Sequence, residues 1–157
     1  MGLFDIFKRK DVKLDGFSKK YEPELVTLLK NDHDLLQGLL SELKQIAVVR
    51  DMPAFTQKIK DFNRVLKNHL IVENIKFYSY IEEKYADNET LRKQIHAYRI
   101  EMESIGVVIN RFINTYNKEA LGAADWELTV PDIENLITLL NRRIDKEELE
   151  LYALYVK

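Results

Sequence analysis

Cysteine is absent from this 157-residue chain, which excludes disulfides, thiolate metal sites and cysteine nucleophiles. Glycine and proline number only five and three, and so few turn-forming residues favour long helices. The chain has no signal peptide and no apolar run long enough to cross a membrane, so we expect a cytoplasmic protein. A strong charge of either sign is also missing, because the formal net charge is −2 and acidic and basic residues are interspersed. We therefore expect no nucleic-acid partner.

The residues that are present have the balance of a globular protein. Hydrophobic residues make up 46% of the chain and charged residues 32%, which argues against disorder. The length suits one domain with a substantial core. We expect that domain to span residues 23–157, after a lead-in segment formed by residues 1–22.

The lead-in segment combines apolar and basic side chains. It contains, in order, Leu3, Phe4, Ile6, Phe7, Lys8, Arg9 and Lys10. Such a segment could lie on an anionic membrane or bind a partner. The alternative is a frayed terminus, or a segment that packs against the domain.

Apolar residues that recur every three or four positions predict four helices, over about residues 23–49, 51–85, 88–116 and 131–157. Pro23 and Pro131 each suit a first helical turn, and Asp87 and Asn88 are both suitable N-caps for the third helix. We place Gly122 and Trp126 in the loop before the fourth helix. No segment alternates with a period of two, so we predict no sheet. Long helices with short links indicate an all-α, antiparallel up-and-down four-helix bundle.

The chain has three histidines, and their placement is the most informative feature of the sequence. His33 and His69 lie on the predicted inner faces of the first and second helices. Glu73 follows His69 by four residues, so both side chains point the same way, one turn apart. An imidazole and a carboxylate so placed could bind one iron, manganese or zinc ion inside a bundle. His96 opens the inner region of the third helix, although it lies at the edge of the apolar stripe and could instead face solvent. Glu147 lies on the inner face of the fourth helix.

The segments that carry these residues resemble the hemerythrin-like, or HHE, cation-binding family. They read NDHDLL around His33, NHLIVENIKFY around His69 and Glu73, and RRIDKEELELY around Glu147, with His96 between the last two. The resemblance covers about residues 23–157. It implies a hemerythrin-like bundle that binds one or two iron ions and that binds or senses oxygen, nitric oxide or redox state, with a diatomic gas as ligand. The metal ligands that it implies are His33, His69, Glu73, His96 and Glu147.

The fourth helix departs from that family at one position. Arg143 stands four residues before Glu147, where the family has a histidine, and an arginine stays protonated and cannot bind a metal. The alternative is therefore a metal-free bundle in which Arg143 pairs with Glu73 and Glu147 and replaces the charge of the ion. Such a protein would be a regulatory or interaction module. The regulator of sigma D family similarly has an arginine four residues before an acidic residue, which implies a sigma factor as partner.

Motifs of common enzymes are missing from the chain. It has no glycine-rich phosphate loop, no G-x-S-x-G and no H-E-x-x-H, so we expect no enzymatic activity. The candidate surfaces for a protein partner are the lead-in segment and the loop around Trp126. Asp32, Asp34 and Glu101 are expected on a solvated rim of the bundle. The alternative for Asp32 is that it orients a metal-bound histidine. Helical bundles often form dimers, which the sequence leaves open.

Overall fold

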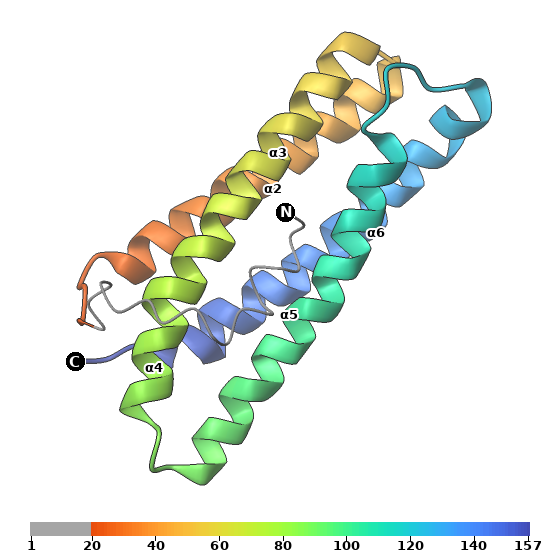
Figure 1. Ribbon diagram of the computed structural model, residues 1–157. Coiled ribbons are helices and arrows are strands. Elements are labelled where there is room, and N and C mark those ends of the chain that lie inside the picture. The colour runs from red at the N-terminus through yellow and green to blue at the C-terminus, as the bar shows by residue number, and fades with distance from the viewer. Residues whose placement is uncertain (1–19) are drawn as a thin grey trace.

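A computed structural model describes residues 20–157 of the chain. The apolar and basic residues of the predicted lead-in segment lie outside these described residues. Within them, four long helical segments run up and down a bundle (Figure 1). Residues 20–157 contain no strand, so the predicted all-α four-helix bundle is confirmed. In the same part of the chain, no helix is both long enough and apolar enough to cross a membrane.

Two of the four helical segments change their helix type along their length. The first segment is α2 (Leu25–Val49), and the third is α5 (Glu89–Tyr116). The second consists of α3 (Met52–Val72), the π-helix η1 (Glu73–Tyr78) and α4 (Ser79–Lys84). The fourth consists of α6 (Ala123–Lys146), the π-helix η2 (Glu147–Leu151) and the 3₁₀ turn η3 (Tyr152–Leu154). Helix α2 packs against α3 and α6, and α5 packs against the same two helices.

The fourth helix begins well before the residue that the sequence predicted. It starts at Ala123, and Pro131 lies inside it rather than at its first turn. The earlier start is possible because Oδ2 of Asp125 accepts a hydrogen bond from the backbone N–H of Gly122, at 3.2 Å. Pro131 is on the exposed side of the helix. The backbone carbonyl that a proline leaves without a helical N–H can therefore bond to water there.

The earlier helix start also changes the prediction for Trp126. This residue was expected in a loop, as part of a surface for a partner, but it lies in α6 and is buried. Its ring packs edge-on against Phe55 of α3, with the ring centroids 5.2 Å apart. The predicted loop surface around Trp126 is therefore wrong.

A layer of charged side chains separates two buried apolar clusters in the bundle. On α2, His33 lies between Leu29 of one cluster and Leu36 of the other. The fourth segment repeats this order, with charged residues between Leu140 and Leu151. Among residues 20–157, the buried polar and charged residues are His33, His69, Glu73, Thr129, Arg143 and Glu147. All of them except Thr129 belong to this polar layer, so burial concentrates the charges of the core at one level of the bundle.

Candidate metal centre

The structure brings four of the five predicted ligands together. His33 comes from α2, His69 from α3, Glu73 from the start of η1 and Glu147 from the start of η2. Each is at most 3% exposed. One ligand atom each from His33, His69 and Glu147 lies within 4.8 Å of the others, and no other such group of three is found among residues 20–157. The inward faces of three helices therefore meet at one point.

The fifth predicted ligand, His96, does not join this group. It is exposed on α5 and lines a shallow surface pocket with Arg92, Lys93 and Arg99. The prediction that His96 opens the inner region of its helix is therefore corrected. The reason is that the buried position on this face of α5 is Ile95, one residue earlier. Successive side chains of an α-helix point about 100° apart. His96 accordingly points away from the bundle axis.

The imidazole of His33 is held at both nitrogens by carboxylates. Nδ1 lies 2.8 Å from Oε1 of Glu148, and Nε2 lies 3.0 Å from Oε2 of Glu147. A carboxylate only accepts hydrogen bonds, so Nδ1 carries a proton and turns Nε2 towards the centre of the layer. Burial alone would lower the pKa of His33, but the hydrogen bond with Glu147 and the nearby carboxylates raise it above its usual value. The metal-free site thus favours a proton on Nε2, where an ion would bind.

His69 is oriented in the same way from the other side. Its Nδ1 lies 3.3 Å from Oδ2 of Asp32, and its Nε2 lies 4.0 Å from Oε2 of Glu73. The two imidazole rings are neighbours, with centroids 4.8 Å apart. A carboxylate on the outer nitrogen of an imidazole is the usual support of a metal-bound histidine. Both histidines of the cluster have this support. For His69 it comes from Asp32, a role that the sequence offered only as an alternative to a solvated rim.

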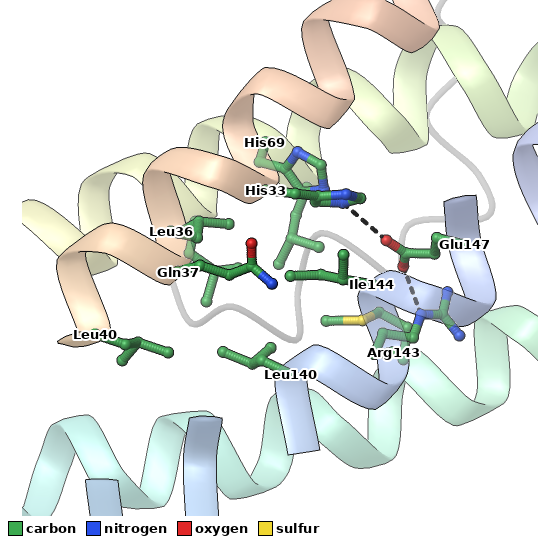
Figure 2. Close-up of a pocket in the computed structure, with 12 residues that line it drawn as sticks. His33, Leu36, Gln37, Leu40, His69, Leu140, Arg143, Ile144 and Glu147 are labelled. Atoms are coloured by element: carbon green, nitrogen blue, oxygen red, sulfur yellow. Dashed lines mark hydrogen bonds and ion pairs between the residues drawn. The ribbon is translucent and has the colours of Figure 1, made fainter. Parts of the chain in front are cut away.

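Arg143 binds the other side of the Glu147 carboxylate. Its Nε donates to Oε1 of Glu147, so this carboxylate lies between His33 and Arg143 (Figure 2). The terminal nitrogens of the guanidinium donate to the backbone carbonyl of Tyr98, at 3.1 Å, and to the hydroxyl of Tyr78, at 3.2 Å. Burial would raise the pKa of Glu147, but its hydrogen bond with His33 and the charge of Arg143 hold that pKa below its usual value. Glu147 is therefore a buried, ionised and paired carboxylate.

Glu73 is less well compensated than Glu147. Its Oε1 accepts a hydrogen bond from the hydroxyl of Tyr152, at 3.1 Å. Its Oε2 is buried and has no hydrogen-bond partner within residues 20–157. Burial and the nearby Glu147 raise the pKa of Glu73. A buried carboxylate oxygen without a partner is costly, and either a proton or a cation would compensate it.

Tyr152 is a further member of the cluster, and it was not predicted from the sequence. Its hydroxyl lies 3.3 Å from Nε2 of His33, and its ring stacks on that imidazole with the centroids 5.7 Å apart. Burial, together with the charges of Glu73 and Glu147, raises its pKa well above the usual value. Its phenol is therefore protonated in the metal-free protein. The signal in the sequence is a repeated spacing, because a tyrosine follows both Glu73 and Glu147 by five residues.

The side chains of the cluster fit one metal ion. Two imidazoles and two carboxylates are ligands that suit iron, manganese or zinc, and a cation would compensate Oε2 of Glu73, which has no hydrogen-bond partner among residues 20–157. A cavity of about 20 Å³ adjoins His33, His69, Glu147 and Arg143. It has room for about one water-sized molecule. The rest of its lining is mainly apolar, including Leu36, Leu70 and Ile144.

The same side chains do not fit a second ion. The guanidinium of Arg143 already donates a hydrogen bond to Oε1 of Glu147, and it carries a permanent positive charge. Helix α5 brings no imidazole to the cluster, because its histidine is exposed. Arg143 therefore supplies the positive charge on this side of the polar layer.

Comparison with known protein families assigns the chain to one family. A family model described as Hemerythrin HHE cation binding domain matches residues 20–155. The matched region contains every residue of the buried cluster. No curated protein and no solved structure matches the chain significantly.

Proposed function

The chain belongs to the hemerythrin HHE cation-binding family, and we propose that it binds a single non-haem iron ion through His33, His69, Glu73 and Glu147. We further propose that the bound iron serves to bind or sense oxygen, nitric oxide or redox state, and that the protein is not an enzyme. These roles rest on the family and on the chemistry of the ligands.

One observation carries the proposal. Both buried imidazoles have a carboxylate on Nδ1, and both turn Nε2 towards the two buried glutamates. A core stabilised by packing alone would not need the buried carboxylates of Glu73 and Glu147 beside the two histidines, because buried charges cost free energy unless they are compensated. A divalent cation at the Nε2 atoms would compensate them.

The residues around the site define what the protein contributes. Iron, when bound, would supply a coordination position for a diatomic molecule or a change of oxidation state. Glu148 and Asp32 would hold the imidazoles in place from outside. The apolar lining of the adjoining cavity would admit a small uncharged molecule and exclude most water. This suits reversible binding better than chemistry on a larger substrate.

Metal analysis of three histidine variants tests the proposal. We expect purified protein reconstituted with ferrous iron to hold about one equivalent, and His33→Ala and His69→Ala to lose it. His96→Ala is the matched control, because it removes the exposed histidine and should keep the iron. Wild-type protein with less than about a tenth of an equivalent would contradict iron binding. Equal loss of iron in all three variants would contradict the assigned ligands.

A metal-free regulatory module is the second candidate function, and Arg143 is the observation that favours it. Its guanidinium compensates Glu147 without an ion, as a metal-free bundle requires. The resemblance to the regulator of sigma D family stays a prediction, as do a protein partner and a dimer, because the family match names the hemerythrin domain alone. Protein that binds no iron but captures a sigma factor from a defined mixture would favour this second function.

A further inference from the structure

One spacing occurs twice in the chain, once at each π-helix. A cationic or imidazole side chain is followed after four residues by a buried glutamate, and five residues later by a buried tyrosine. The two sets are His69, Glu73 and Tyr78, and Arg143, Glu147 and Tyr152. Both glutamates are the first residues of their π-helices.

The π-helices explain why the tyrosines face the polar layer. In an α-helix, residues five apart differ by about 140° in direction, so a tyrosine at that spacing would point away from its glutamate. A π-helix joins residues five apart by hydrogen bonds and brings them near one another on one face. The backbone N–H of Tyr152 makes such a bond to the carbonyl of Glu147. The widened turn therefore places the phenol of Tyr152 in the polar layer, beside Glu73 and His33.

The two tyrosines have different partners there. The hydroxyl of Tyr78 accepts a hydrogen bond from Arg143, on the side of the layer that holds the guanidinium. The hydroxyl of Tyr152 instead lies 3.1 Å from Oε1 of Glu73 and 3.3 Å from Nε2 of His33. Only Tyr152, of the two, therefore touches residues that would hold the ion.

The distances around Tyr152 match those between neighbouring ligands of one ion. Metal–oxygen and metal–nitrogen bonds of about 2.1 Å put adjacent ligand atoms about 3.0 Å apart in an octahedron and about 3.4 Å apart in a tetrahedron. The phenol oxygen is within this range of both Glu73 and His33, and Nε2 of His33 is 3.0 Å from Glu147. On this basis, and resting on the proposed iron site, we propose that Tyr152 is a further ligand, whose phenolate oxygen binds ferric iron.

The proposed coordination needs no reactant beyond the ferric ion. The O–H bond of Tyr152 breaks, its oxygen keeps the electron pair as it bonds to the iron, and the proton leaves to solvent. The anionic oxygen adds a hard, negatively charged donor, which favours a trivalent ion over a divalent one. The site would then hold ferric iron more tightly than two histidines and two carboxylates alone.

Ferric iron supplied directly tests the assignment. Chelator-treated protein receives one equivalent of ferric nitrilotriacetate, and bound iron and the visible spectrum are measured after gel filtration. We expect wild-type protein to gain a visible phenolate-to-iron charge-transfer band. Tyr152→Phe should bind iron without that band, whereas Tyr78→Phe, the matched control from the other π-helix, should keep it. Resonance Raman excitation within the band should enhance tyrosine ring vibrations in the wild type, a readout that does not depend on the folding of any variant.

The outcomes separate this inference from the proposed function. Iron-loaded wild type without the band, or a band that persists in Tyr152→Phe, would overturn the role of Tyr152 while leaving the iron site intact. If the band is lost in Tyr78→Phe but kept in Tyr152→Phe, the ligand is Tyr78, and the inference about Tyr152 is overturned. Wild type that binds no ferric or ferrous iron would overturn both proposals together.

Discussion

Arg143 sets the charge balance of the polar layer at the scale of single residues. It is 2% exposed, yet its guanidinium has partners on all of its nitrogens: Glu147, the Tyr98 carbonyl and the Tyr78 hydroxyl. A buried carboxylate that loses its cation keeps the cost of burial without the attraction that offset it. Arg143 thus stabilises the metal-free fold. Its positive charge also leaves no room for a second cation on that side of the site.

Substitution of Arg143 should therefore be costly in the absence of metal. We expect Arg143→Met to lower the free energy of unfolding of chelator-treated protein by about 3–5 kcal/mol, because it leaves Glu147 buried without its guanidinium. Its neighbour Arg142 is exposed, so Arg142→Met should change stability by less than about 0.5 kcal/mol. Urea unfolding followed by circular dichroism measures both. Equal losses of unfolding free energy in the two variants would show that the hydrogen bonds of Arg143 do not stabilise the fold.

The turn between α2 and α3 shows how one element boundary positions the site. Arg50 ends α2 in the left-handed region, with φ 57° and ψ 36°, and its N–H bonds to the carbonyl of Ala47, at 3.2 Å. Asp51 then caps α3 by accepting from the N–H of Ala54, at 3.1 Å. So short a turn fixes the register of the two helices, and that register places His33 beside His69.

Arg50 is the one non-glycine residue with positive φ among residues 20–157. Left-handed backbone strains a residue that has a Cβ, and glycine is the usual residue after a helix end. We expect Arg50→Gly to raise the free energy of unfolding by about 0.5–1 kcal/mol, and Arg50→Ala, which keeps the Cβ, to bring no such gain. Chemical denaturation of the three proteins decides this. A larger gain from alanine than from glycine would show that the arginine side chain, rather than the backbone, is unfavourable there.

At the scale of the whole molecule, the candidate site joins three of the four helical segments. His33, Glu73 and Glu147 come from segments far apart in the sequence, and their side chains meet only when the bundle is closed. An ion bound there has no comparable site in the unfolded chain. Metal binding and folding should therefore be coupled.

This coupling predicts a thermal shift. At a free ion concentration of about 100 times Kd, binding should stabilise the fold by about 2.7 kcal/mol, which raises the Tm of a domain of this size by about 5–10 °C. Calorimetry with ferrous iron under anaerobic conditions, against the same protein with chelator, measures the shift. His69→Ala should show none, while His96→Ala should match the wild type. An equal rise in His69→Ala would indicate binding of iron elsewhere on the protein.

Much of the fold could be predicted because helical periodicity is a local property. The stripe that contains Leu29, Leu36 and Leu40 is buried as expected, and the step of four from His69 to Glu73 places both in the core. The start of the fourth helix was missed because a proline was interpreted as a first turn. The cap that Asp125 provides at Gly122 is a weaker signal in the sequence.

The sequence alone determined that the chain forms four helices, most of the residues on their inner faces, and the family, since each depends on spacing along the chain and on residue type. Only the tertiary structure decided which side chains meet. Nε2 of His33 reaches Glu147 because α2 and η2 are in register, His96 is excluded by a rotation of one residue, and Tyr152 enters because the helix widens to a π turn. Contacts between helices depend on their relative positions and on local departures from 3.6 residues per turn, and the spacing of residues along a regular helix contains neither.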